Sequence, residues 1–487
     1  MGAQLIQVDW AVVLIMLPLS AAMLGFLLPG MARNIGLLAA LLILFTVVGL
    51  GWQLTQTGVY SHVAGGWLAP LGIQLHADGF SLLMLATSAI VGVAVSIYST
   101  GYFKAADDQR FWPTWLLLWA ALNALFLAAD VFNLYVTLEL LGLSAVTLAS
   151  LTGSKDSVSA AMRYLLSTLL GSLAFLLGIG LLYHQYGSVD IAILSERVND
   201  STVSWAALGL ITAGLALKTA LFPFHFWLPP AHASAPAPVS ALLSALVVKA
   251  SFYILLRLWL GLFDFQQDST VANMLGILGA TAVLWGSIQA LRQIRLKMLV
   301  AYSTVAQIGY LFLAFPLAQT GGNRVWYAVA YLMLSHALAK AAMFLVAGNM
   351  MLFGGHDRIV NLDRVVQRLP VTVAAFGLAG VSIMGLPPSG GFIAKWLLLE
   401  AALAQGHWGI AGIMMLGGIL AAAYVFKVLG YAFIPSPVPH QAVSVPARMQ
   451  WMALLLATLA IMAGFVAQPL MQLIGIGALF DSTGSMP

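Results

Sequence analysis

The sequence predicts an all-α polytopic membrane protein of about 14 transmembrane helices. Hydrophobic residues make up 61% of the 487 residues and charged residues only 7%, whereas an ordinary soluble domain has roughly 25% charged residues. The apolar residues occur in repeated runs of about 20, which is the length that a spanning helix needs. Short segments with Gly, Pro, Asp, Lys or Arg separate these runs. The pattern favours one compact helical bundle in a bilayer.

Apolar periodicity predicts helices centred near residues 19, 44, 89, 120, 141, 173, 214, 249, 283, 306, 337, 386, 420 and 462, to within about 2 to 4 residues. We expect the seventh helix to be interrupted at 221–230 (LFPFHFWLPP) and the twelfth at 385–391 (GLPPSGG). Proline removes a backbone donor and clashes with the preceding turn, so neither helix can be continuous. Irregular backbone at membrane depth is tolerated only against protein or a wet cavity.

The two interrupted helices indicate an internal repeat. Lys218 precedes the first break and Lys395 follows the second, and paired broken helices mark the transport site in carriers built from inverted repeats. The predicted organisation is therefore N-terminal helices 1–3 (residues 1–110), a first five-helix repeat of helices 4–8 (111–262), a second, inverted repeat of helices 9–13 (271–435), and a C-terminal helix 14 with a tail (447–487).

The basic loop residues predict the topology by the positive-inside rule. Twelve fall on one side of the predicted bundle: Arg33, Lys104, Arg110, Lys155, Arg163, Arg292, Arg295, Lys297, Arg358, Arg364, Arg368 and Arg448. Only Arg197 and Arg324 fall on the other. We therefore expect both termini on the outer face, together with the loops 55–76, 187–204 and 263–270. The remaining basic residues lie inside predicted helices: Lys218, Lys249, Arg257, Lys340, Lys395 and Lys427.

Charged residues at membrane depth are functional candidates, because each costs from about 3 to 10 kcal/mol or more at the bilayer centre. Glu139, in the predicted helix 131–151, is the one acid far from any loop. Burial lowers the pKa of a lysine and a nearby carboxylate raises it again. A changing distance from Glu139 to Lys218 or Lys249 would therefore switch a lysine between its charged and neutral forms, as a proton relay requires.

Further along, His336 and Lys340 are four residues apart and share a helix face, and Lys395 completes the series. Histidine titrates nearest to neutral pH, which suits a shuttle position. Ser and Thr side chains and water would bridge the intervals. The sequence leaves other interpretations open: Arg257 and Lys427 extending to the membrane surface, His336 as a satisfied core residue, and His225 and His232 as loop residues.

The composition excludes several kinds of site. The sequence has no cysteine, so disulfides, thiolate metal sites and iron–sulfur ligation are excluded. We expect no cofactor and no metal. We also expect no nucleic-acid partner, since the basic residues are scattered among loops. A membrane lipid or glycosyl transferase would need clustered acids or histidines, but the longest loops offer only scattered Asp and Glu. A purely structural scaffold would not need the buried lysines.

At these residues the chain resembles the antiporter-like membrane subunits shared by Mrp-type multisubunit cation/proton antiporters, respiratory complex I and membrane-bound hydrogenases. The resemblance covers 130–140 (DVFNLYVTLEL), 218–230, 238–249 and 385–395, within a region that ends near Phe433. It implies 14 helices with two inverted five-helix repeats and discontinuous helices 7 and 12. It also implies Glu139 and Lys218 as a coupled pair, Lys249 and His336 as the central relay, and Lys395 as the terminal lysine.

Within that family, the lysine at 395 is similar to the D subunit of Mrp antiporters or to the distal subunit of complex I, and the segment 245–253 is more similar to the Mrp D subunit. The segment 335–340 is at least as similar to the hydrogenase and complex I pattern as to the Mrp pattern. The resemblance implies a non-enzymatic, proton-translocating subunit of a monovalent cation (Na+)/proton antiporter in the bacterial inner membrane. Its expected partners are other membrane subunits, the lipid bilayer, H+ and Na+. The alternative is a proton-pumping subunit of complex I, of a membrane-bound hydrogenase or of an inorganic-carbon uptake complex.

Overall fold

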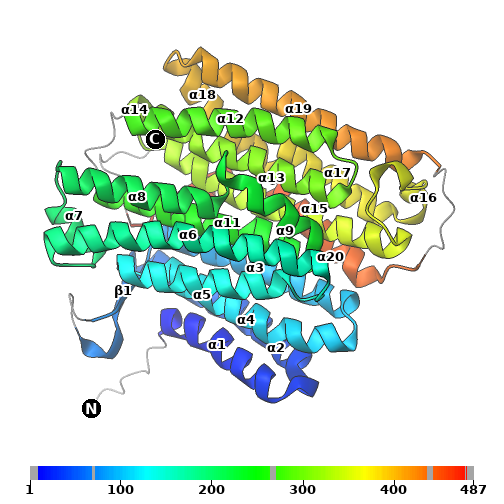
Figure 1. Cartoon of the computed structure of the whole chain (residues 1–487), viewed down its shortest axis with the longest axis horizontal. Coiled ribbons are helices and arrows are strands. Elements are labelled where there is room, and N and C mark those ends of the chain that lie inside the picture. Colours follow the sequence, from blue (N-terminus) through cyan, green and yellow to red (C-terminus); the bar gives the residue numbers. More distant parts are fainter. Residues whose placement is uncertain (1–8, 68–71, 264–269, 436–442, 478, 480–487) are drawn as a thin grey trace.

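The computed structural model describes residues 9–67, 72–263, 270–435, 443–477 and 479. These residues form helices joined by short loops, together with one β-hairpin (Figure 1). The N-terminal elements are α1 (Trp10–Leu27), α2 (Ala32–Thr57), β1 (Tyr60–Val63), β2 (Gln74–Ala77) and α3 (Gly79–Tyr102). The next group is α4 (Ala105–Leu127), α5 (Val131–Ala149), α6 (Lys155–Tyr186), α7 (Ile191–Arg197), α8 (Thr202–Thr219), α9 (Leu228–Ser234), α10 (Ala237–Leu242) and α11 (Val248–Leu262).

The C-terminal part of the chain is also helical. It comprises α12 (Thr270–Arg292), α13 (Leu296–Phe312), α14 (Ala314–Gly321), α15 (Arg324–Gly354), α16 (Val365–Arg368), α17 (Pro370–Met384), α18 (Gly390–Ala404), α19 (Trp408–Phe433), α20 (Ala447–Met462) and α21 (Ala467–Ile474). In Figure 1 the long helices follow the long axis, from α1 and α2 along one edge to α18 and α19 along the other.

Eleven helical segments of the described chain are long and apolar enough to cross a membrane, or twelve if α20 and α21, which are bent by 84°, count as one. The membrane fold is therefore confirmed, with fewer qualifying spans than the predicted 14. The broken helix explains part of the difference, because α17 and α18 have 15 residues each. At 1.5 Å per residue each is about 22 Å long, less than the roughly 30 Å of a hydrocarbon core.

The C-terminal helix differs from the prediction. We expected a helix centred near residue 462, but α20 ends there and the chain then bends. The bend lies where Gly464 approaches the backbone of Pro388, since a Cβ at Gly464 would lie 1.7 Å from the Pro388 carbonyl oxygen. The Tyr331 hydroxyl also donates to the carbonyl of Ala463. Contact with the second helix break thus shapes the end of α20.

Two spans form the centre of the bundle. The most apolar parts of Ala237–Leu262 and Arg324–Gly354 are 100% buried, against 33–39% for Trp10–Leu27, Pro29–Thr57 and Trp408–Phe433 at the edges. Glycines bring neighbouring helices close, as is common in membrane bundles. An added Cβ on Gly214 of α8 would lie 2.3 Å from the backbone of Gly171 in α6, and one on Gly309 of α13 would lie 2.5 Å from Gly279 in α12. The candidate residues on α10–α11 and α15 are therefore shielded by the rest of the chain.

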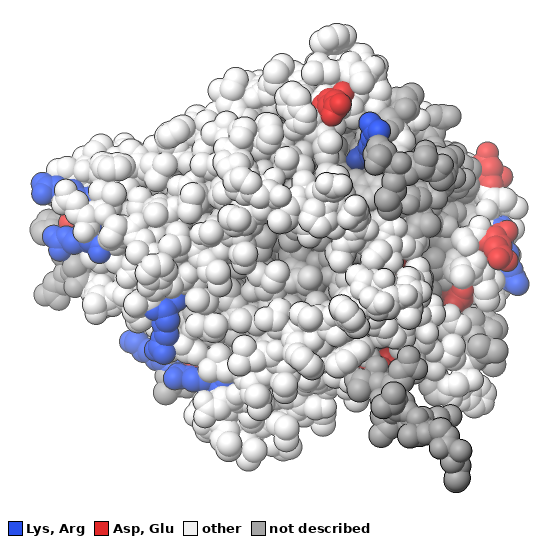
Figure 2. Space-filling view, turned by 180° about the vertical axis from the view of Figure 1, so that it is seen from behind, with Lys and Arg blue, Asp and Glu red and all other residues white. Residues whose placement is uncertain are grey.

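The two ends of the bundle differ in charge. Figure 2 shows Lys and Arg gathered mainly at one end of the visible face, and most visible Asp and Glu toward the other. The basic end is the one that carries α16 in Figure 1, and the hairpin and α7 lie at the opposite end. The hairpin pairs Tyr60 with Ala77 and Ser61 with His76. The described parts of the predicted outer loop 55–76 and the loop 187–204 thus share the end away from α16. Residues 68–71 and most of the loop 263–270 lie outside the described residues.

Candidate functional site

Both predicted helix breaks are present, and each begins with a residue in the left-handed conformation. Ala220 follows α8 with φ 61°, and Gly385 follows α17 with φ 80°. At the first break the Trp227 indole nitrogen donates to the Leu217 carbonyl at 3.0 Å. At the second the Lys395 amine donates to the Ile383 carbonyl at 2.7 Å. The last carbonyls of a helix have no backbone N–H partner within it. At both breaks a side chain donates a hydrogen bond to such a carbonyl.

Glu139 and Lys218 form a direct ion pair. The Lys218 Nζ lies 2.6 Å from the Glu139 Oε1, and the Ser172 hydroxyl donates to the same oxygen. The Lys218 side chain is 5% exposed, but that of Glu139 is 23% exposed. Glu139 is therefore only partly covered by the rest of the chain. Its helix turns Val136 and Leu143, one turn away on either side, toward the outside of the bundle.

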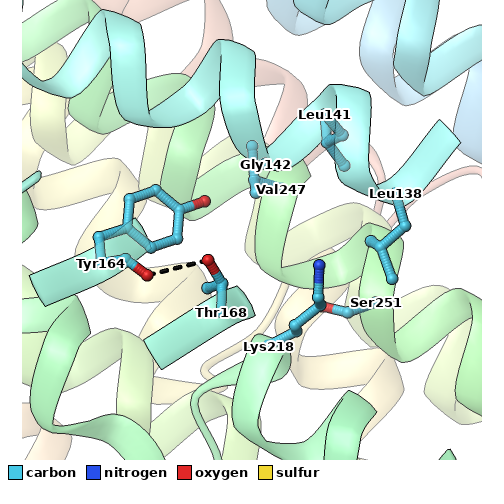
Figure 3. A pocket seen from close by; sticks show the side chains of 8 residues that line it. All are labelled: Leu138, Leu141, Gly142, Tyr164, Thr168, Lys218, Val247 and Ser251. Carbon is cyan, nitrogen blue, oxygen red and sulfur yellow. Dashed lines mark hydrogen bonds between the residues drawn. The ribbon is translucent and has the colours of Figure 1, made fainter. Parts of the chain in front are cut away.

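A small cavity adjoins Lys218 (Figure 3). Its walls come from α5, α6, α8 and the start of α11: Leu138, Leu141, Gly142, Tyr164, Thr168, Lys218, Val247 and Ser251. Its volume of about 10 Å³ is close to the least space that holds one water. Val247 and Ser251 are four residues apart and share one face of their helix, so the cavity lies between Lys218 and that face.

Lys249 follows a local widening of its helix. Residues Leu243–Val247 form a π-helical turn, a feature frequent at functional sites. The Lys249 amine donates to the Ser244 carbonyl at 2.5 Å, and the Ser244 hydroxyl lies 2.9 Å from that of Thr304. Lys249 is buried and has no acidic partner among the described residues.

His336 and Lys340 lie on α15 at the centre of the bundle. Lys340 donates to the Ser303 hydroxyl and, at 3.2 Å, to the Val300 carbonyl. Both ring nitrogens of His336 are buried without a hydrogen-bond partner in the described part of the chain. The described chain therefore supplies no hydrogen-bond partner that would make His336 a satisfied core residue. His336 instead interacts electrostatically with Lys249, Lys340 and Lys395.

Lys395 has an aromatic and backbone environment. Its amine lies 4.2 Å from the centre of the Tyr310 ring, a cation–π distance. The Gln307 amide also approaches the Ile383 carbonyl that Lys395 contacts, at 3.5 Å. A cavity of about 160 Å³ adjoins the lysine, lined by Tyr310, Met384, Gly385, Phe392, Lys395, Trp396, Leu399, Met414, Met415 and Gly418. This cavity has space for several waters.

The structure thus brings the predicted residues together in two groups. Glu139 and Lys218 are in direct contact. Lys249, Lys340 and Lys395 each interact electrostatically with His336. The predicted polar side chains Ser244, Ser303 and Thr304 are buried between the helices of this second group. The small cavity of Figure 3 adjoins Lys218 of the first group and the helix that carries Lys249.

Two other basic residues differ from the surface-extending interpretation. Arg257 is buried, and its Nη2 lies 2.9 and 3.0 Å from the two carboxylate oxygens of Asp78. Burial alone would raise the pKa of Asp78, but the Arg257 guanidinium outweighs burial and holds that pKa below its ordinary value. Lys427 is half-buried and donates to the carbonyls of Leu291 and Gln293 at the end of α12. The interpretation that the Arg257 side chain extends to the membrane surface is therefore wrong. Lys427 caps the C-terminal end of α12.

Two further buried groups were not predicted from the sequence. Lys297, counted there among the loop charges, is the second residue of α13 and is 1% exposed. His232, considered as a loop residue, lies in α9 and is also 1% exposed. The one signal in the sequence for Lys297 was its position directly before the apolar run of the tenth predicted helix. Among the described residues, no group of three or more His, Cys, Asp or Glu side chains is arranged to hold a metal ion.

Comparisons with known proteins agree with this arrangement. The family described as NADH:quinone oxidoreductase/Mrp antiporter, transmembrane region, matches residues 128–421. The chain is 34% identical to the N subunit of the NADH-quinone oxidoreductase of Desulforudis audaxviator over 87% of this chain and 86% of that protein. It is 30% identical to the D subunit of the Na+/H+ antiporter of Bacillus subtilis over 87% of each chain.

The fold is also found in solved structures. A chain of the Mrp complex from Dietzia sp. DQ12-45-1b superposes with a TM-score of 0.90, at 24% identity and over 97% of both chains. At that identity the likeness concerns the fold alone. The family match covers more than half of the sequence, and both curated relatives are at least 30% identical over most of it. The chain therefore belongs to the NADH:quinone oxidoreductase/Mrp antiporter family of membrane subunits.

Proposed function

We propose that this chain is the proton-translocating subunit of a multisubunit monovalent cation (Na+)/proton antiporter. In this proposal protons pass along Glu139, Lys218, Lys249, His336, Lys340 and Lys395. The observation that carries the proposal is the ion pair of Glu139 and Lys218 next to buried lysines that have no acidic partner among the described residues. Buried ionisable groups of this kind are characteristic of proton relays in membranes.

The contacts of each lysine suggest how it would exchange a proton. A carboxylate at 2.6 Å favours the ammonium form of Lys218, and separation of the pair would favour release of its proton. Lys249, Lys340 and Lys395 donate to carbonyl or hydroxyl oxygens, which accept from either the ammonium or the amine. Mutual repulsion would disfavour more than one charge among these three at a time. A proton arriving at one lysine would thus promote release from the next.

The surface supports association with other membrane subunits. A carboxylate that is 23% exposed at membrane depth is unfavourable against lipid, and a neighbouring protein helix over α5 would shield it. We further propose that α4, the α17–α18 pair and α20 also cross the membrane, which with the eleven spans found would give 14. The basic end would face the bacterial cytoplasm, with both termini outside. The two breaks, approached from opposite ends of the bundle by α8 and α17 (Figure 1), support inverted repeats.

The second candidate is a proton-pumping, antiporter-like subunit of respiratory complex I or of a related redox complex. The 34% identity to the N subunit of an NADH-quinone oxidoreductase, against 30% to the D subunit of an antiporter, favours it. The same buried residues would serve either complex, because they move protons and contain no redox group of their own. In both cases the chain would act as a transport subunit and not as an enzyme by itself. The proteins that copurify with the chain would distinguish the two.

The proposal is tested by charge removal in the intact complex. Glu139→Gln and Lys218→Met should each abolish Na+-dependent dissipation of a pH gradient in vesicles, measured for equal amounts of assembled complex. Asn199→Gln, in the loop before α8, serves as a control that leaves the buried charges intact. Normal gradient dissipation in both charge variants would contradict the proposed path. If the purified complex instead carries iron–sulfur or flavin subunits and does not respond to Na+, the second candidate is supported.

A further inference from the structure

Two buried groups outside the predicted path, Lys297 and His232, lie between the basic end of the molecule and the central lysines. Lys297 is the second residue of α13 and follows Arg295 by two positions. The Arg295 Nε donates to the Asp357 carboxylate at 2.9 Å. The Leu296 amide donates to the Asp357 carbonyl at 2.7 Å. The Arg295 side chain is 46% exposed, whereas Asp357 and Lys297 are buried. Lys297 is therefore the first buried amine behind a surface ion pair.

Lys297 is attached to the broken helix. Its amine donates to the Ala235 carbonyl and, at 3.3 Å, to that of Ala233. These carbonyls lie at the end of α9, the short helix that follows the first break. Lys297 also interacts electrostatically with Asp357. One amine thus links the surface of the basic end to the segment next to His232.

His232 faces the central lysines. Its ring stacks on that of Phe344, with centroids 4.7 Å apart. Phe344 follows Lys340 by four residues on α15, so both lie on one helix face. His232 interacts electrostatically with Lys297, Lys340 and Lys249. The ring is therefore placed between the amine near the surface and two members of the central group.

The ring of His232 has an unused polar atom. Its Nδ1 is buried without a hydrogen-bond partner among the described residues. An unsatisfied buried polar atom is unfavourable, and proteins usually satisfy such atoms with ordered water. A water at Nδ1 would extend the polar contacts from the ring toward the neighbouring amines.

We propose that Asp357, Lys297 and His232 form a proton-uptake arm that leads from the basic end to Lys249 and Lys340. The inference rests on the proposed proton translocation and adds its point of uptake. A proton attracted by Asp357 binds the lone pair of the neutral Lys297 amine and forms an ammonium group. The ammonium releases a proton through water to the neutral His232 ring, which passes it to a neutral Lys340 or Lys249. Lys297 and His232 return to their neutral forms, the accepting Lys340 or Lys249 becomes an ammonium group, and only N–H and O–H bonds form or break.

A structural role for Lys297 is the competing explanation, since a cation near carbonyls at a helix end is stabilising. Lys297→Arg separates the two roles. Arginine keeps the positive charge and the donors for the α9 carbonyls but does not deprotonate in proteins. In the complete complex in vesicles, we expect Lys297→Arg to preserve assembly and to lower proton transport by at least about tenfold, as loss of a proton-transfer group does.

His232→Gln should lower transport similarly while the complex assembles, because glutamine retains polar atoms and cannot carry a proton. The matched control is His225→Gln, on the same broken span, whose ring is also largely buried but for which no interaction with the central lysines is found. It should transport like the wild type. Transport near the wild-type rate in Lys297→Arg or His232→Gln would overturn the uptake arm. If Glu139→Gln is inactive in the same assay, wild-type transport in Lys297→Arg or His232→Gln contradicts only the uptake arm. If Glu139→Gln is also active, the proposed function fails as well.

Discussion

Lys218 and Lys395 each lie beside a helix break, but different groups surround the two amines. Lys218 contacts a carboxylate at 2.6 Å next to a cavity of about 10 Å³. Lys395 contacts a backbone carbonyl at 2.7 Å and an aromatic ring at 4.2 Å, next to a cavity of about 160 Å³. The first charge is compensated by an opposite charge, and the second by dipoles, a ring and space for water. The two breaks are therefore alike in backbone and different in electrostatics.

The largest effect is expected from removing the carboxylate that distinguishes the first break. Glu139→Gln leaves the Lys218 amine without its counter-charge, so proton transport should fall by at least about tenfold, given that a charge-assisted hydrogen bond contributes about 1.5–3 kcal/mol. The yield of assembled complex should fall too. Adding Lys218→Met removes the uncompensated charge and should restore assembly but not transport. Yield after purification and gradient dissipation in vesicles measure the two effects. A double variant that assembles no better than the single one would contradict the pairing.

Arginine substitutions sharpen the comparison next. Lys395→Arg keeps a cation that does not deprotonate, and the adjoining cavity can accept the larger guanidinium. It should assemble normally and lose transport. Lys218→Arg has little free space beside it, and overpacking costs about 1–3 kcal/mol, so this variant should also assemble poorly. Equal yields of the Lys395→Arg and Lys218→Arg complexes would show that cavity size does not decide whether a site accepts the larger arginine side chain.

The backbone at the breaks predicts a smaller effect on stability. Gly385 has φ 80°, and a Cβ there would lie 2.8 Å from the Lys395 side chain. Gly385→Ala should therefore lower stability by about 1–2 kcal/mol, the usual penalty of the left-handed conformation. Ala220 already adopts that conformation at the first break. Ala220→Gly should be near neutral, because relief of about 1–2 kcal/mol offsets a lost buried methyl of about 0.8 kcal/mol. Thermal unfolding of the detergent-solubilised complex would measure both, and a stabilising Gly385→Ala would contradict this account.

The sequence predicted the parts of this arrangement that depend on local pattern. Proline pairs located both breaks, and apolar runs located most of the helices. The ion-pair partners of the buried charges depend on how the helices pack, and the sequence did not predict them as reliably. Lys218 and Glu139 are 79 positions apart, and Arg257 and Asp78 are 179 apart. A hydropathy pattern indicates that a charge is buried, but not which helix supplies its partner.

The same reasoning explains the two missed groups. Lys297 stands at a loop boundary, where a basic residue ordinarily faces the cytoplasm, and the carbonyls that hold it belong to a helix 62 positions away. His232 follows two prolines, which favour a loop in the sequence, but α9 begins there and buries the ring. The partial exposure of Glu139 was likewise not predicted, because apolar residues, Val136 and Leu143, lie one turn away from it on either side.

The smallest effect is expected at Asp130, a carboxylate outside the membrane spans that lacks a basic partner in the described chain. Asp130 caps α5 through the Asn133 amide at 2.7 Å. Burial raises its pKa, although the hydrogen bonds from Asn133 oppose the shift. A raised carboxyl pKa means that the folded state loses stability as the pH rises from the ordinary value of about 3.9 through the folded value. Asp78, with Arg257 beside it, has the opposite shift and loses stability as the pH falls.

Asp130→Asn keeps a good N-cap, since Asn and Asp cap helices about equally well, and it removes the charge that burial disfavours. Relative to the wild type, the variant should therefore gain stability between pH 4 and pH 7, by less than about 1 kcal/mol, which is the typical worth of a cap. Thermal unfolding at the two pH values would measure the gain. Asp130→Ala is the control, because it removes the cap and should be less stable than Asp130→Asn at both. A relative loss of stability for Asp130→Asn toward neutral pH would mean that a positive partner compensates this carboxylate, as Arg257 does for Asp78.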